Sequence, residues 1–223
     1  MMKNYFSPIH LLFFVALLGI IIILIQIELL SFAFVKLGLP PEFGLIILFL
    51  SLLGSAVNLP VARIKSTATE QTFTQSVYKG LLRIPAQPFN NETQIFINLG
   101  GCLIPVTLSI YLFSNSALSL SFTLLGIAII SSISYIFSRP ISGLGIGMPI
   151  LIAPISAALV GLSISPDQRA SLAYISGTLG VLIGADLLRM KDISRLGTPY
   201  ASIGGAGTFD GIFITGIVAA LLA

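Results

Sequence analysis

Charged residues are scarce in this chain, and their scarcity excludes a water-surrounded fold. Of 223 residues, only 9% are Asp, Glu, Lys or Arg, whereas 56% are hydrophobic. An ordinary soluble domain carries about 25% charged residues. Apolar runs of roughly 20 residues favour membrane-spanning helices over the alternating strands of roughly 10 residues that build membrane barrels. We therefore predict an all-α, polytopic transmembrane helical bundle.

Cysteine and histidine are nearly absent, with one of each, and tryptophan is missing. A single cysteine, Cys102, excludes an intramolecular disulfide and a cysteine-based metal site. The sequence contains no phosphate-cradling Gly-Lys motif and no Gly-x-Ser-x-Gly nucleophile elbow. We therefore expect no cofactor and no metal. The formal net charge of +3 does not imply a nucleic-acid partner, and the partner that the composition implies is the lipid bilayer.

Seven apolar segments stand out when the hydropathy is averaged over about 19 residues. These segments are Ile9–Leu30, Gly44–Val61, Ile95–Phe113, Ala117–Phe137, Met148–Ile164, Ala170–Leu188 and Gly205–Ala223. We interpret residues 1–223 as a single transmembrane domain with about seven helices. The one sizeable polar stretch, residues 63–94, is predicted to be a loop within it. Residues 72–82 of this loop either pair as a short hairpin or lie on the membrane as a helix.

Basic residues are concentrated in alternate connections between these segments. The N-terminal tail and the second, fourth and sixth connections hold nine of them, namely Lys3, Arg63, Lys65, Lys79, Arg83, Arg139, Arg189, Lys191 and Arg195. The opposite side holds only Lys36 and Arg169. Because cytoplasmic connections carry an excess of Lys and Arg, this split predicts a cytoplasmic N-terminus and an external C-terminus. The loop at residues 63–94 is then cytoplasmic.

Two aspartates lie near the ends of the last two predicted helices, where a lipid environment does not suit them. Asp186 precedes the cytoplasmic end of the sixth segment, and Asp210 follows the start of the seventh. Consecutive helices bring both carboxylates to a similar depth. If they face each other they would share a proton, as acid–base dyads do. The alternative interpretation pairs Asp186 with Arg189, one helical turn further on.

The glycines of the sixth segment bear on this pairing. At about 100° per residue, Gly177 and Gly184 share a helix face nearly opposite Asp186. Small residues at such spacing allow helices to approach closely. We therefore expect this face to pack against a third helix rather than against the seventh segment, which weighs against the simplest dyad.

Further polar residues fall at the same cytoplasmic depth as the aspartates. They are Asn58, Asn98 and Arg139. One interpretation is that they line a single cavity with Asp186 and Asp210. The other is that each is an ordinary polar residue at a helix end.

The fourth connection, SRPISGLGIGMP, is rich in glycine and proline. Its glycines are Gly143, Gly145 and Gly147. Because glycine and proline interrupt helices, we predict that this connection is not helical. It is either a re-entrant segment that acts as a gate or an ordinary loop followed by a helix.

The segments SRPISGLGIGMP, SGTLGVLIGADLL and ASIGGAGTFDGIFITG carry a family resemblance. From about Asn58 onward the chain resembles the uncharacterised bacterial and archaeal membrane family catalogued as domain of unknown function 1614. This resemblance implies a multi-pass protein of a prokaryotic plasma membrane, without an established activity. A weaker likeness is to presenilin and prepilin-peptidase aspartyl proteases, which carry Gly-x-Gly-Asp. Gly207 and Asp210 match that motif, whereas Phe209 replaces its second glycine and no Pro-Ala-Leu follows.

The sequence therefore predicts an integral membrane protein with a polar, aspartate-bearing cavity near the cytoplasmic side. Three functions stay open. The first is a paired-aspartate hydrolase that uses Asp186 and Asp210 as base and acid. The second is a proton- or cation-coupled transporter or channel, and the third is a non-catalytic scaffold. The sequence names neither a substrate nor a transported solute, and it leaves assembly into an oligomer open.

Overall fold

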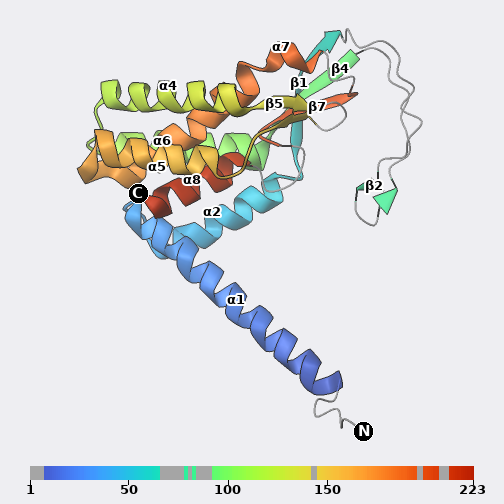
Figure 1. Ribbon diagram of the computed structural model, residues 1–223, viewed down its shortest axis with the longest axis vertical. Coiled ribbons are helices and arrows are strands. Elements are labelled where there is room, and N and C mark those ends of the chain that lie inside the picture. The colour runs from blue at the N-terminus through green and yellow to red at the C-terminus, as the bar shows by residue number, and fades with distance from the viewer. Residues whose placement is uncertain are drawn as a thin grey trace.

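The computed structural model describes residues 8–65, 78–79, 82–83, 92–141, 145–194, 198–205 and 211–223. Within these ranges the chain is mainly helical, with its strands gathered at one end of a helical bundle (Figure 1). The apolar helices are α1 (Pro8–Lys36), α2 (Pro41–Gly54), α3 (Ile104–Asn115), α4 (Leu120–Phe137), α5 (Ile152–Ile164), α6 (Arg169–Val181) and α8 (Gly211–Leu222). Each of the seven predicted apolar segments overlaps one of them. The predicted helical bundle is confirmed.

Shorter elements extend or connect these helices. The π-helix η1 (Leu99–Leu103) leads into α3, and the π-helix η3 (Leu182–Leu187) continues α6. A 3-10 turn, η2 (Pro166–Gln168), precedes α6, and α7 (Met190–Ile193) follows η3.

Three helical stretches are long and apolar enough to cross a membrane. They are Leu11–Lys36, Leu120–Phe137 and Pro166–Leu187. Shorter apolar helices are Pro41–Gly54, Leu99–Asn115, Ile152–Ile164 and Gly211–Leu222. Many large apolar side chains, such as Leu12 at 71% and Ile136 at 67%, are exposed on the protein surface. Water would make such a surface costly, so the protein is embedded in a membrane.

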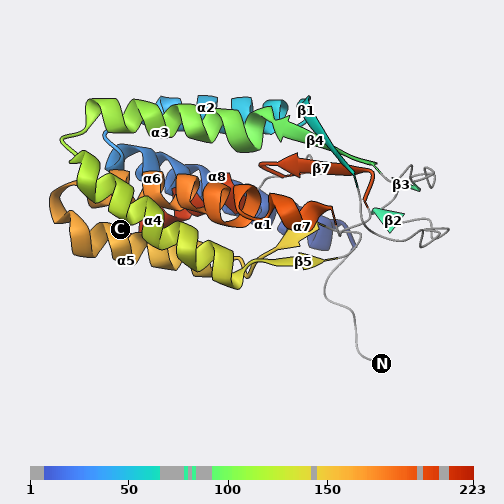
Figure 2. The same ribbon diagram turned by 90° about the horizontal axis from the view of Figure 1, so that it is seen from above.

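Helix α6 forms the centre of the bundle, between α4, α5, α8 and α3 (Figure 2). All side chains from residue 170 to 178 are buried. Small residues permit this close packing: a Cβ on Gly180 would lie 2.6 Å from Ile130 of α4. In an apolar 18-residue window of the stretch Pro166–Leu187, 78% of the residues are buried inside the protein, whereas none is buried in the corresponding window of Leu11–Lys36.

Helix α1 leaves the bundle at an angle, and only its C-terminal end packs on α2 and α8 (Figure 1). Ala33, Phe34 and Leu37 are buried there. The Lys36 Nζ donates a hydrogen bond of 2.8 Å to the Leu221 carbonyl. A lysine suits this place because the carbonyl ends of helices attract positive charge.

The connections between the helices lie at two opposite ends of the bundle. The C-terminus lies at the end opposite to the strands (Figures 1 and 2). The connections at residues 37–40, 116–119 and 165–168 share the C-terminal end. Which end faces the cytoplasm stays a prediction.

A three-stranded sheet at the bundle end was not predicted. Its strands are β1 (Asn58–Lys65), β4 (Glu92–Asn98) and β7 (Tyr200–Ile203), in the order β1-β4-β7. Strands β1 and β4 are antiparallel, from Asn58 opposite Asn98 to Lys65 opposite Glu92, and β4 and β7 are parallel. The predicted helices Gly44–Val61 and Ile95–Phe113 are therefore wrong at their sheet ends. There the backbone hydrogen bonds connect strands instead of successive helical turns.

Two short strand pairs complete the described connections. Strands β2 (Tyr78–Lys79) and β3 (Leu82–Arg83) are antiparallel neighbours, which favours the hairpin over the surface helix for this part of the 63–94 stretch. Strands β5 (Arg139–Ile141) and β6 (Gly145–Gly147) also pair antiparallel. Helix α4 ends before this pair and α5 begins after it. The prediction that this connection is not helical is confirmed for its described residues.

Candidate functional site

The segment that follows β7 touches both π-helices at the sheet end. The backbone N–H of Gly204 donates a hydrogen bond of 3.0 Å to Oδ2 of Asp186 in η3. Gly204 has φ +81°, and a Cβ there would lie 2.6 Å from the Cβ of Cys102 in η1. Only glycine combines this conformation with so close an approach. Gly204 thus joins η1 and η3, and π-helices are frequent at functional sites.

Asn98 connects four elements beside this junction. It is 1% exposed, and its Oδ1 accepts a hydrogen bond of 2.7 Å from the Gly101 N–H at the start of η1. Its Nδ2 donates to the Ser55 carbonyl at 2.7 Å and to Oδ1 of Asn58 at 3.0 Å. Because both ends of the amide are used, Asn98 binds α2, β1 and η1 to β4.

Asn58 extends the same hydrogen-bond network to β7. Its Oδ1 accepts a hydrogen bond of 2.9 Å from the Ser202 hydroxyl, two residues before Gly204. The structure therefore brings together three of the predicted site residues: Asn58 and Asn98 directly, and Asp186 through the β7 segment.

Arg189 connects the end of η3 to the C-terminus of α4 through hydrogen bonds. Its Nη2 donates to the carbonyls of Tyr135 at 2.7 Å and Ser138 at 2.8 Å, and its Nε donates to the Ser138 hydroxyl at 3.2 Å. Its ion pair, at 3.0 Å, is made with Asp192. The sequence suggested an ion pair between Asp186 and Arg189. In the structure, Arg189 instead pairs with Asp192, one helical turn further along the chain.

The glycine face of α6 and η3 packs partly as predicted. A Cβ on Gly184 would collide with the Ser131 carbonyl of α4, so this glycine packs against a helix other than α8. Gly177 lies between Ala157 of α5 and Thr215 of α8. Gly184 therefore packs against α4 as predicted, whereas Gly177 packs against both α5 and α8.

The remaining predicted site residues are less connected or lie outside the described ranges. Arg139 is exposed on β5, where it is the register partner of Gly147 on β6. Gly145 adopts φ +114° with open space around it. Asp210 and Gly143 lie outside the described residues. The separation of Asp186 and Asp210 therefore stays a prediction, and so does the single cavity.

Four buried hydroxyl groups were missed by the sequence reasoning. Ser131 and Ser134 of α4 have no hydrogen-bond partner among the described residues, whereas the buried hydroxyls of Tyr174 and Thr178 of α6 interact with each other. Tyr174 and Thr178 face α8 at Gly216, where a Cβ would lie 2.5 Å from the Thr178 hydroxyl oxygen. Their spacing of three or four residues was the available signal, since it places both members of a pair on one helix face.

The comparison with protein families identifies the chain. Residues 52–222 match the family described as protein of unknown function (DUF1614), and the chain belongs to that family. The match includes the sheet, both π-helices and Asp186, and it confirms the resemblance seen in the sequence. No curated protein matches the chain, and no solved structure matches it.

Proposed function

We propose that this member of the DUF1614 family is a membrane-embedded hydrolase that uses Asp186 and Asp210 as an acid–base pair. The observation that carries the proposal is the hydrogen bond from the Gly204 N–H to the Asp186 carboxylate. Gly204 starts the segment that leads to Asp210 six residues later, and six extended residues span at most about 21 Å. The length of the chain therefore keeps Asp210 within about 21 Å of Gly204, a range that includes the short separation that an acid–base pair needs.

The chemistry needs a water molecule between the two carboxyl groups. One aspartate takes a proton from this water as its oxygen attacks a carbonyl carbon of the substrate, and the other donates a proton to the leaving nitrogen. Both steps conserve charge and require no cofactor. In the described sheet β7 is an edge strand that runs directly into Gly204, so an extended peptide added to this edge would be led toward Asp186.

A photoaffinity probe tests this proposal. The probe is a peptide with a hydroxyethylene group, which mimics the tetrahedral intermediate of amide hydrolysis. We expect Asp186→Asn and Asp210→Asn each to reduce labelling more than tenfold, because each removes one acid–base group and keeps its shape. Asp167→Asn, at the opposite end of the bundle, is the matched control and should label like the unmodified chain. Undiminished labelling of Asp186→Asn would overturn the proposal.

The buried hydroxyl groups favour proton or cation transport as a second candidate. Thr178 lies two helical turns from Asp186, inside the bundle, and its buried hydroxyl lies beside that of Tyr174. Polar residues inside a membrane bundle mark ion paths. In proteoliposomes with a pH-sensitive dye, Thr178→Val should then abolish flux. Thr107→Val, which changes an exposed threonine of α3, should leave flux intact. Absence of flux in the unmodified chain leaves hydrolysis as the proposed function.

For the location we propose a prokaryotic plasma membrane with the sheet end in the cytoplasm. Nine of the eleven Lys and Arg residues support this orientation, because they belong to the N-terminal tail and to the connections at the sheet end.

A further inference from the structure

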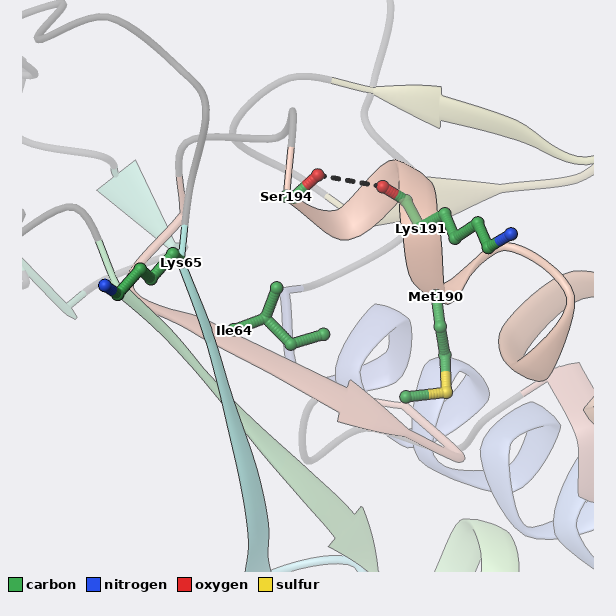
Figure 3. A pocket seen from close by; sticks show the side chains of 5 residues that line it. All are labelled: Ile64, Lys65, Met190, Lys191 and Ser194. Carbon is green, nitrogen blue, oxygen red and sulfur yellow. Dashed lines mark hydrogen bonds between the residues drawn. The ribbon is translucent and has the colours of Figure 1, made fainter.

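An open cleft separates the tip of β1 from α7 (Figure 3). Its volume is about 380 Å³, and it is lined by Ile64, Lys65, Met190, Lys191 and Ser194. The side chains of Ile64 and Met190 extend into the space between the two elements (Figure 3). Those of Lys65 and Lys191 lie at opposite rims and extend outward (Figure 3). The cleft thus combines an apolar interior with two basic rims.

The positive charge of the rims is largely uncompensated. Within the described residues, neither Lys65 nor Lys191 makes an ion pair, since the carboxylate next to Lys191, that of Asp192, pairs with Arg189. Glu92 faces Lys65 across the β1–β4 ladder and is the one acidic neighbour by register. A long lysine side chain lets each ammonium group reach back over the cleft. An anion in the cleft would therefore be attracted by the ammonium groups of both lysines.

The surface next to the cleft is apolar. Leu187 at 42% and Leu188 at 55% are exposed just before α7, and Ile136 and Phe137 are exposed at the end of α4 that Arg189 holds beside them. Exposed apolar side chains followed by lysines mark the level at which a membrane protein passes from hydrocarbon to lipid headgroups. The cleft lies at this level.

We propose that the cleft between β1 and α7 binds an anionic phospholipid. Lys65 and Lys191 would hold the phosphate of the headgroup, and Ile64 and Met190 would contact the glycerol and the upper part of an acyl chain. The same residues would discriminate against a zwitterionic lipid, whose own cation repels the lysines. This binding does not depend on the hydrolase proposed above.

The test measures lipid retained by the purified full chain, using native mass spectrometry with phosphatidylglycerol or phosphatidylcholine added to the detergent. We expect preferential retention of phosphatidylglycerol, and a loss of at least fivefold in the double variant Lys65→Gln and Lys191→Gln. Arg139→Gln is the matched control, because it removes an exposed cation at the same end outside the cleft. The amount of phosphatidylglycerol that Arg139→Gln retains should change less than twofold.

Two further measurements make the result decisive. The double variant Lys65→Arg and Lys191→Arg keeps both charges and should keep phosphatidylglycerol bound, which separates lost charge from a folding defect. Inorganic phosphate alone is the second probe, and it should neither bind at millimolar concentration nor displace the lipid. Equal losses in Arg139→Gln and the double glutamine variant, or displacement by free phosphate, would overturn the proposal.

Discussion

Single glycines set how closely the elements at the sheet end approach one another. Gly184 faces the backbone of Ser131, and Gly204 faces that of Cys102. The first contact fixes η3 against α4, and the second fixes the end of β7 against η1. Asp186 lies two residues after Gly184, and its carboxylate accepts a hydrogen bond from the Gly204 N–H. Its position therefore depends on two places where no side chain fits.

Gly184→Ala should destabilise the protein, because its new methyl group would meet the Ser131 carbonyl, which is backbone and cannot rotate away. Overpacking of this kind costs about 1–3 kcal/mol. Gly19→Ala is the control: it lies in α1 with nothing within 4 Å of its Cβ, and it should cost no stability. Thermal unfolding in detergent, followed by circular dichroism, measures both. Equal melting temperatures for Gly184→Ala and the unmodified chain would refute the close contact.

At this scale the sequence identified the polar outliers but not their partners. Asn58, Asn98 and Asp186 stand out because polar groups are rare in apolar segments. The bond from Gly204 to Asp186 connects residues 18 positions apart, and no local pattern encodes it. The direction of Asp186 was inferred from an α-helical rotation per residue, whereas residues 182–187 form a wider π-helix.

Among the elements, the strands could not be predicted from hydropathy. The run from Ile95 to Ile97 is as apolar as the helix that follows it, and a short apolar run does not distinguish strand from helix. What makes it a strand is pairing with β1 on one side and with β7, about a hundred residues later, on the other. By contrast, the glycines and prolines of the fourth connection act locally. The interruption between α4 and α5 was therefore predictable.

Asn98→Asp tests the junction of α2, β1, β4 and η1. The change replaces the Nδ2 donor with an oxygen that faces the Ser55 carbonyl and Oδ1 of Asn58, so two hydrogen bonds become repulsions. We expect a loss of about 3 kcal/mol in unfolding free energy and faster hydrogen exchange in β4. Asn115→Asp, at an exposed helix end, should cost less than about 1 kcal/mol. If the two variants lost similar amounts of unfolding free energy, the structural role assigned to Asn98 would be refuted.

For the whole molecule, the number of helices and their alternation follow from sums over many residues. Hydropathy averaged over about 19 positions tolerates local error, so the seven segments were found even where their ends were wrong. In the structure the sheet and the β5–β6 pair lie at one end of the bundle, and the connections at residues 37–40, 116–119 and 165–168 lie at the other. The orientation in the membrane rests on the distribution of basic residues alone.

Labelling of single cysteines from each side of the membrane tests this account most directly. Ser194→Cys lies at the sheet end and Asn115→Cys at the opposite end of the bundle. The native Cys102 is buried, so the unmodified chain is the blank. With an impermeant maleimide we expect Ser194→Cys to react only in inside-out vesicles and Asn115→Cys only in right-side-out vesicles. Reaction of both positions from the same side would contradict a bundle that crosses the membrane between them.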